Sequence, residues 1–252
     1  MKKKNMIITI ALICGLSLNL LACSNQQPKG EKAKAEVNAN DSSTNQTIPE
    51  LKSTHVYDFD FSEKAINAFE ADIERTQESI YDALGAECSF YCGCNMGEQK
   101  ASSTLKQQGK KDYKDSNIHD LDFSTTWVEG AEGYGVGEWV EYTLPAYNPR
   151  ITELLIANGY VRTKKLWEEN SRVKVLDVEV NGKPFARIHL ADIYALQSVK
   201  VPYIGYSDRE NRENLNGKAP IRIRFIIREV YPGTKYEDTA ISEIFFDGID
   251  VH

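Results

Sequence analysis

The polar residues whose spacing most suggests chemistry lie in the segment Asp120-Leu-Asp122-Phe-Ser-Thr125. Two carboxylates and a hydroxyl stand close together along the chain, and such oxygen ligands suit a hard cation such as calcium. The same composition is typical of a turn in which Asp side chains bind backbone N–H groups without an ion. Either interpretation predicts a tight loop over residues 120–125.

The motifs that identify common enzyme classes do not occur in the sequence. It contains no Gly-x-Ser-x-Gly, no His-Glu-x-x-His and no phosphate-binding glycine loop. The four histidines stand apart from one another, at His55, His119, His189 and His252. Carboxylates are plentiful, so the residues alone leave open a glycosidase that uses two acids. We expect a non-catalytic protein, with a glycan-active enzyme as an alternative.

The first 22 residues have the form of a signal peptide. Three lysines at positions 2–4 precede an apolar run over 6–21 that is too short for a stable membrane span. The run closes on Leu20-Leu21-Ala22-Cys23, which resembles the bacterial lipobox, where the cysteine thiol receives diacylglycerol. Each buried lipid methylene contributes about 0.8 kcal/mol of membrane affinity. We expect cleavage before Cys23 and an extracytoplasmic protein, lipid-anchored in the cell envelope at the outer membrane or cell surface.

Charge and composition limit the class of partner. The chain has 252 residues, a formal net charge of -7 and 41% hydrophobic residues, which fits one globular domain with a tail. The acidic balance and the lack of a long basic stretch argue against nucleic acid as a partner. We expect a monomer.

Three cysteines remain after the signal peptide and the lipidation site are set aside. Cys88, Cys92 and Cys94 lie within seven residues of one another. In an oxidising compartment they favour a local disulfide, with one thiol left over. A zinc site is the alternative, but no histidine stands at finger-like spacing from the cluster.

The composition divides the chain ahead of the main domain into two parts. Residues 23–55 are rich in Asn, Gln, Lys, Ser and Thr, which predicts a disordered tether. Residues 56–85 contain an amphipathic helix pattern between Ser62 and Gly85. Its apolar residues recur at three- and four-residue steps, at Ile66, Phe69, Ile73, Ile80 and Leu84. We expect this helix to pack on the following domain, and a partner-binding or coiled-coil helix is the alternative.

Residues 86–252 have the periodicity of strands. In 221–228 the apolar residues alternate with arginines, as in a half-buried antiparallel strand. In 172–180 the alternation slips by one residue, which predicts a β-bulge, and Asn181-Gly182 then predicts a tight hairpin turn. Further strands are predicted at 138–144, 151–157 and 241–246. The fold class is therefore all-β, a β-sandwich.

Ordered motifs along this domain carry a family resemblance. They are Ala101-Ser102-Ser103, Asn117-Ile-His-Asp120-Leu-Asp122-Phe-Ser-Thr125-Thr-Trp127, Trp127-Val-Glu-Gly130, Gly133-Tyr-Gly135-Val-Gly137-Glu138, Asn158-Gly-Tyr160, Asn170-Ser-Arg172 and Tyr236-Glu-Asp238-Thr-Ala-Ile-Ser-Glu243. They resemble the discoidin or coagulation factor 5/8 type C domain. The resemblance is closest to the glycan-binding translocation domain attached to streptococcal NAD glycohydrolase. It implies an eight-stranded, galactose-binding-like jelly-roll sandwich that binds sugars through loops at one end.

The resemblance also implies a structural calcium or sodium ion. Carried over by position, its ligands are Asn117, Asp120, Asp122, Thr125, Ser242 and Glu243. Leu121 stands where the pattern often has glycine, so its side chain restricts the turn and weakens the case for calcium.

Glycan binding requires an exposed aromatic ring and planar polar side chains. Among the family motifs the best candidates are Glu129, Tyr160, Asn170 and Arg172, although each can equally serve the structure alone. The arginines at 222, 224 and 228 could meet an acidic glycan, and a solvated face is the simpler interpretation. The NAD-cleaving domain of the resembling toxin has no counterpart here, since we expect only a tail and one helix before the sandwich. A surface adhesion or assembly module that recognises protein is the remaining alternative.

Overall fold

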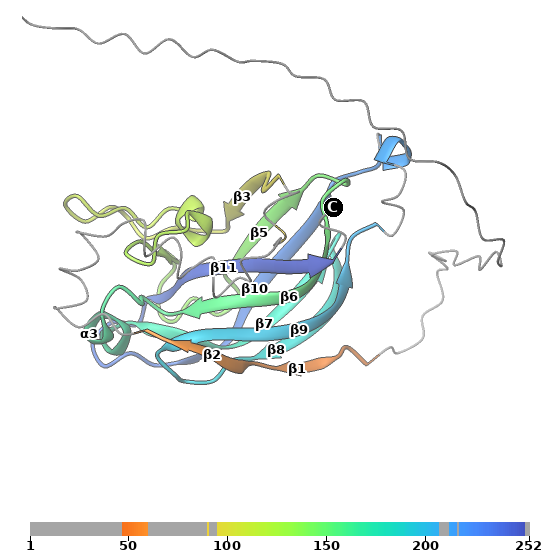
Figure 1. Ribbon diagram of the computed structural model, residues 1–252. Helices are drawn as coiled ribbons and strands as arrows, with labels where there is room; N and C mark the ends of the chain where they lie inside the picture. Colours follow the sequence, from red (N-terminus) through yellow and green to blue (C-terminus); the bar gives the residue numbers. More distant parts are fainter. Residues whose placement is uncertain (1–46, 60–89, 91–94, 207–211, 216, 250–252) are drawn as a thin grey trace, which may run out of the picture. The chain divides into compact units, whose positions relative to one another are not determined.

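The computed structural model describes residues 47–59, 90, 95–206, 212–215 and 217–249 (Figure 1). The predictions for the signal peptide, lipidated Cys23, the helix after Ser62 and the cysteines Cys88, Cys92 and Cys94 lie outside the described residues. In the part that is described, no helix has the length and apolar character that crossing a membrane requires.

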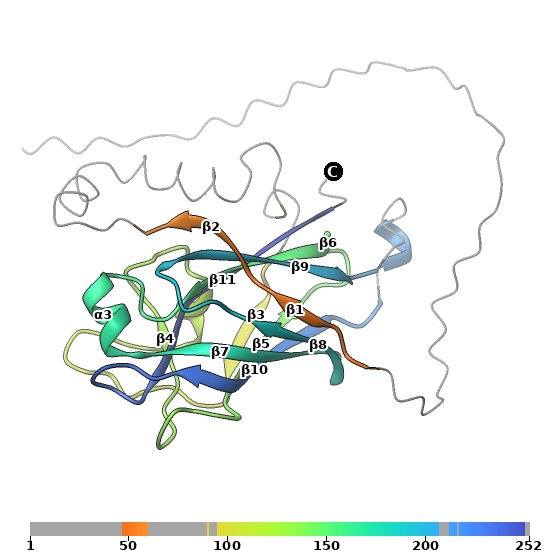
Figure 2. The same ribbon diagram turned by 90° about the horizontal axis from the view of Figure 1, so that it is seen from below.

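The strands form two layers of a sandwich, as predicted (Figures 1 and 2). One layer has the order β2 (Thr54–Asp58), β9 (Ala195–Ile204), β6 (Arg150–Asn158), β11 (Thr239–Ile249). The other has the order β3 (Glu98–Ala101), β5 (Trp139–Leu144), β10 (Ile221–Tyr231), β7 (Ser171–Val180), β8 (Lys183–His189), β1 (Glu50–Lys52). Short β4 (Trp127–Val128) pairs with β11, and a parallel contact between the starts of β11 and β7 joins the layers at one end.

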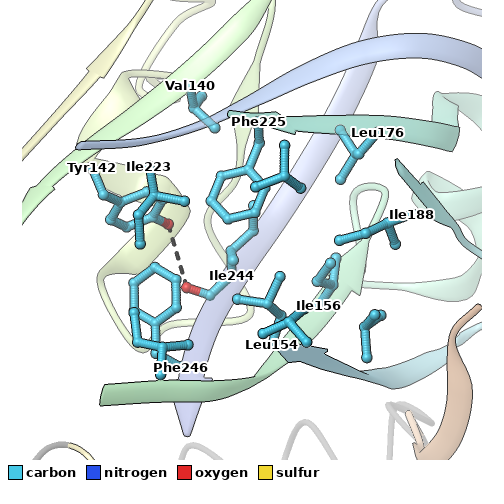
Figure 3. Packing of buried hydrophobic residues seen from close by; sticks show 14 of the residues in the cluster. Val140, Tyr142, Leu154, Ile156, Leu176, Ile188, Ile223, Phe225, Ile244 and Phe246 are labelled. Carbon is cyan, nitrogen blue, oxygen red and sulfur yellow. Dashed lines mark hydrogen bonds between the residues drawn. The ribbon is translucent and has the colours of Figure 1, made fainter. Parts of the chain in front are cut away.

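The core fills the space between the two layers because the alternating apolar residues of each layer point inward. In Figure 3, Tyr142, Ile223 and Phe225 of one layer face Ile244 and Phe246 of the other. The buried Tyr142 hydroxyl donates to the backbone oxygen of Ile244 at 3.3 Å, so it is not left unpaired (Figure 3). A second cluster, which includes Trp167 and Phe245, lies outside this main core.

The local predictions for 172–182 are confirmed. The β7–β10 ladder slips between Ile227 and Val230 of β10, opposite the point where the β7 alternation changes phase. The turn from β7 to β8 has Asn181 at φ 52° and Gly182 at φ 75°, the left-handed pair that a tight hairpin requires. The alternation of β10 also holds, since Ile221, Ile223, Phe225 and Ile227 are buried.

The predicted tether over residues 23–55 is wrong at its C-terminal end, and residues 56–58 also fall in a strand. Residues 50–58 form β1, which pairs in parallel with β8, and β2, which pairs antiparallel with β9. Between them, the Ser53 hydroxyl donates to Gln197 Oε1 at 2.7 Å and accepts from the backbone N–H of Ala191 at 3.0 Å. The polar composition misleads because an edge strand is bound through backbone groups that any side chain permits.

Three short helices complete the described part: η2 (Asp115–His119), α3 (Lys164–Glu169) and η3 (Arg212–Leu215). Thr163 is the N-cap of α3, and its hydroxyl accepts from the backbone N–H of Leu166 at 3.1 Å. This cap fixes the loop after β6, next to the end of the sandwich where β7 starts.

Candidate functional site

A pocket with an apolar floor lies beside α3, where the loops after β3 and β6 meet the loop before β11. Its volume is about 270 Å³. The floor is a small buried cluster that contains Tyr113, Val128 and Tyr160, against which Leu105 and Leu166 pack. Aromatic rings in such a floor offer flat apolar faces with a hydroxyl at the edge. The pocket can therefore contact both the apolar face and the polar edge of a small ligand.

Polar side chains form the rim of this pocket, at Gln108, Lys111, Asn170, Tyr236 and Asp238. The Lys111 ammonium lies 5.8 Å from the centroid of the Tyr160 ring, within the range of a cation–π contact. Lys111 belongs to a tight turn closed by backbone hydrogen bonds with Gln108 at 3.0 and 3.1 Å. The Asp238 backbone oxygen accepts from the N–H of Ser171 at 3.1 Å, which holds Asp238 at the start of β7.

Several polar groups of the pocket have no hydrogen-bond partner among the described residues. Within the described part of the chain, no hydrogen bond reaches the Asp238 carboxylate or the hydroxyls of Tyr113 and Tyr160. Burial raises the pKa of Tyr113, and the nearby Tyr160, Tyr236 and Asp238 raise it further, so this phenol stays neutral and can donate. Unmatched donors and acceptors above an apolar floor suit a ligand that carries several hydroxyls.

Of the four predicted glycan-binding residues, Tyr160 and Asn170 line the pocket. The Asn170 amide nitrogen donates to the backbone oxygen of Leu166 at 2.8 Å, which closes α3 and leaves the amide oxygen as an acceptor. Tyr160 follows Gly159, whose φ of 92° favours glycine; a Cβ there would lie 2.7 Å from the side chains of Trp167 and Arg172. The glycine of the Asn158-Gly-Tyr160 motif thus allows the backbone beside Tyr160 to pack closely against the Trp167 side chain of α3.

Arg172 and Glu129 do not line the pocket, so the structure does not support direct ligand contact for either. Arg172 is buried, lies 4.3 Å from the Trp167 ring and donates to the backbone oxygens of Trp167 and Asn170. It holds α3 in place. A buried guanidinium satisfied in this way cannot also reach a ligand.

Glu129 supports the glycine-rich loop that follows it. Its two carboxylate oxygens accept from the backbone N–H groups of Thr239 at 3.1 Å and Ala131 at 2.8 Å. Burial raises the pKa of Glu129, although these two hydrogen bonds oppose the shift. Gly135, at φ 63°, packs so closely on this carboxylate that a Cβ would approach it to 2.4 Å. Glu129 therefore links the loop to β11.

The predicted cation loop forms a tight turn with two carboxylates close together. Asp120 accepts from the Thr125 hydroxyl at 2.8 and 2.9 Å, and Glu243 Oε1 accepts from the N–H of Asp122 at 3.1 Å. Glu243 is fully buried, and its Oε2 has no donor among the described residues. Burial and then the neighbouring Asp120 raise the pKa of Glu243 well above its usual range. A hard cation beside Glu243 and Asp120 would relieve their repulsion, so the pair fits such an ion in charge and chemistry.

Two of the six predicted ligands have side chains committed elsewhere. The Asn117 amide nitrogen donates to Asp112 and to the backbone oxygen of Thr126, and the Ser242 hydroxyl donates to Gly159 and accepts from Val161. Successive residues of a strand point to opposite faces, so Ser242 and Glu243 cannot aim their side chains at one ion. Across the described ranges, no cluster of three or more His, Cys, Asp and Glu is arranged as a metal site.

The sequence reasoning missed most of the pocket rim. Lys111 and Gln108 lie in a turn outside the quoted motifs, and their residue types are those of any solvated turn. Tyr236 and Asp238 do belong to the Tyr236–Glu243 motif, which provided the one available signal. That signal is weak because an exposed Tyr and a half-buried Asp are common on protein surfaces.

Comparisons with known proteins agree with this architecture. The family model described as the NAD glycohydrolase translocation F5/8 type C domain matches residues 90–247. No curated protein matches the chain. The family match confirms the predicted discoidin-like domain.

Two similar solved structures contain domains of Clostridium perfringens ZmpB. The structure of its CBM32-1, CBM32-2 and M60 catalytic domains matches with a TM-score of 0.50 and 10% identity, over 83% of this chain and 17% of that one. A structure of CBM32-1 and CBM32-2 in complex with GalNAc matches with a TM-score of 0.49 and 11% identity, over 82% of this chain and 41% of that one. This chain thus spans less than half the length of either match. At such identities the first match shows a shared fold.

Proposed function

Because the chain belongs to the NAD glycohydrolase translocation F5/8 type C domain family, we propose that it is a non-catalytic, glycan-binding protein. The ligand would bind in the loop-end pocket beside α3. The observation that carries the proposal is the pairing of an aromatic floor, Tyr113 and Tyr160, with unmatched polar groups on the rim. A sugar ring presents an apolar face and a polar edge of hydroxyls, and this pocket complements both.

A glycan-active enzyme is the alternative, and the pocket favours binding over turnover. Glycoside hydrolysis uses two carboxyl groups about 5–9.5 Å apart on either side of the bond. Asp238 is the one carboxylate among the described residues that line the pocket. Glu129 follows the pocket residue Val128 in the sequence but does not line the pocket, and its carboxylate already accepts two backbone hydrogen bonds.

We also propose that the domain is held at the cell envelope by lipid on Cys23, as the lipobox predicts. A single shallow site binds sugars weakly, at roughly millimolar to micromolar Kd, about 4 to 8 kcal/mol. Many copies on one surface raise the overall affinity without new contacts. An anchored module of this kind can therefore hold a glycan-bearing surface although each site is weak.

The test is a glycan array probed with the detergent-solubilised full chain and with two matched variants. Tyr236 on the pocket rim and Tyr147 in the turn after β5 have nearly equal exposure, at 40% and 41%. We expect Tyr236→Ala to lose about two- to tenfold in binding, since one aromatic contact is worth about 0.5–1.5 kcal/mol. Tyr147→Ala should bind as the unaltered chain does.

Three outcomes would contradict the proposal. Equal loss in both variants would place the site elsewhere, and an array with no signal would remove the glycan-binding role. Steady release of reducing sugar from a bound oligosaccharide would show that the protein is an enzyme.

A further inference from the structure

The pocket rim carries one cation and one anion, and they differ in exposure. Lys111 is exposed, whereas Asp238 is half-buried at the junction of the β11 loop with β7. The field of Asp238 reaches the floor of the pocket. The pKa of the buried Tyr113 is raised mainly by burial, then by Tyr160 and Tyr236, and also by Asp238. The carboxylate therefore acts on the pocket interior, while the charge of Lys111 is largely screened by water.

A half-buried carboxylate selects ligands by charge and by hydrogen-bond role. It accepts hydrogen bonds and cannot donate them, so adjacent hydroxyls of a sugar ring can both donate to it. Hydrogen bonds to a charged group are stronger than those between neutral groups. A ligand carboxylate or sulfate at the same place would meet like charge and would lose this pair of bonds. The amide oxygen of Asn170 adds a second acceptor on the same rim.

The pocket size limits how much of a glycan is recognised. At about 270 Å³ it is smaller than the roughly 300–1,000 Å³ of sites for drug-sized ligands. One sugar ring can fill it, so the charge of that ring decides the fit.

We propose that Asp238 determines specificity and that the pocket takes an uncharged pyranose with adjacent free hydroxyls in preference to an acidic sugar. This inference rests on the proposed function and specifies the ligand class of the same site. The exposed lysines at 106 and 110 do not line the pocket, so they do not reverse the preference.

The experiment compares matched sugars that differ in one group. Binding of the full chain is measured by calorimetry or NMR titration for methyl galactoside against methyl galacturonoside, and for methyl glucoside against methyl glucuronoside. The N-acetylgalactosamine and N-acetylglucosamine glycosides and sialyllactose extend the panel. In whichever sugar pair binds, we expect the neutral sugar to bind at least about tenfold more tightly than the acidic one. Losing one hydrogen bond to a charged group changes the affinity by at least that factor.

Two variants assign this preference to a residue. Asp238→Asn should weaken neutral binding at least about tenfold and narrow the gap between the paired sugars, because the amide replaces one acceptor by a donor. Glu237→Gln removes an adjacent exposed charge that does not line the pocket and should change neither affinity. Thermal unfolding of both variants checks that they are folded.

The possible results separate this inference from the proposed function. Equal or tighter binding of the acidic sugar would overturn the inference and leave glycan binding intact. A neutral preference that survives in Asp238→Asn would overturn the role of Asp238. Failure of every sugar on the panel and on the array would overturn both proposals.

Discussion

The guanidinium of Arg172 forms a two-point ion pair with Asp192, with Nε–Oδ1 and Nη2–Oδ2 distances of 2.8 and 3.1 Å. The pair joins β7 to the loop between β8 and β9, and the remaining guanidinium nitrogen donates to the backbone oxygens of Trp167 and Asn170. Arg172 is therefore a positioning residue that keeps α3 beside the pocket.

Arg172→Ala should destabilise the domain because it leaves these oxygens and Asp192 without their donor. A broken buried pair costs about 3–5 kcal/mol, and the partial exposure of Asp192 reduces our expectation to about 2 kcal/mol. Urea unfolding measures the change. Arg222→Ala is the control, since Arg222 is exposed on β10. Equal stability of both variants would show that the Asp192 pair contributes nothing.

Leu121→Gly should stabilise the domain. Leu121 has a φ of 64°, a left-handed conformation that costs a residue with a Cβ roughly 1–2 kcal/mol, and 41% of its surface is exposed. After the entropy that glycine loses on folding, a gain of about 0.5–1 kcal/mol should remain. Asn181→Gly is the contrast, because Asn181 tolerates its φ of 52° and its Oδ1 accepts from the N–H of Arg222. A lower Tm for Leu121→Gly would show that the backbone of Leu121 is not strained.

Calcium should stabilise the domain through Glu243 and Asp120. An ion bound only by the folded state adds about 2.7 kcal/mol at a hundredfold excess over its Kd. Glu243→Gln should remove this gain, because the amide neutralises the group that the ion compensates. Glu237→Gln, outside the loop, should keep it. A Tm that neither calcium nor EDTA moves would count against an ion in this loop.

The stability should depend on pH through Glu129. Burial raises its pKa in the folded state above the unfolded value of about 4.3. The folded state therefore holds the proton more tightly, so the contribution of Glu129 is largest below that value and is lost as pH rises through the folded pKa. Relative to Glu129→Gln, the unaltered chain should lose stability as the pH rises above about 4.3. A constant difference in Tm over that range would show that the pKa is not raised.

Cys23→Ala should release the protein from the membrane and leave the domain folded. Without the thiol no diacylglycerol can be attached, and the apolar run before it is too short to act as a stable anchor. Partitioning between detergent and aqueous phases measures retention, and the Tm of the released protein measures folding. Ser24→Ala is the control, since it leaves the thiol in place. A mutant that stays in the detergent phase would refute lipid anchoring at Cys23.

The strands whose apolar residues alternate can be predicted from the sequence. A strand whose buried polar residues are satisfied by side-chain hydrogen bonds, such as β9, cannot. The β10 arginines and isoleucines, and the Asn181-Gly182 turn, carry a period and a turn signal that fix a strand and a hairpin. Strand β9 lacks such a pattern because the polar Gln197 and Ser198 are buried in it and Pro202 interrupts it. Gln197 is tolerated there because its side chain accepts from the hydroxyl of the distant Ser53 and donates to the backbone oxygen of the nearby Ala191.

The site was predictable only in part for a similar reason. Tyr160 and Asn170 lie in motifs of the family and do line the pocket, whereas Arg172 and Glu129 also lie in family motifs but support the loops. Residue type does not distinguish a side chain that meets a ligand from one that holds the backbone behind it. That distinction depends on Asp192 and Thr239, partners that the sequence order does not reveal.

The chain enters the sandwich at the end that lies far from the pocket. Glu50 pairs with Arg187, which pairs with Asp177, seven residues along β7 from Asn170 and so about 23 Å from the pocket at roughly 3.3 Å per residue. From there β1 and β2 run toward α3 and reach Phe59, which packs on Phe123 and Tyr194 (Figures 1 and 2). A tether that joins the chain ahead of Pro49 would therefore pull on the end of the sandwich that lies far from the pocket. If lipid on Cys23 anchors the chain as proposed, the sandwich would be loaded at the end of β7 far from the pocket, which would leave the pocket end free to meet a ligand.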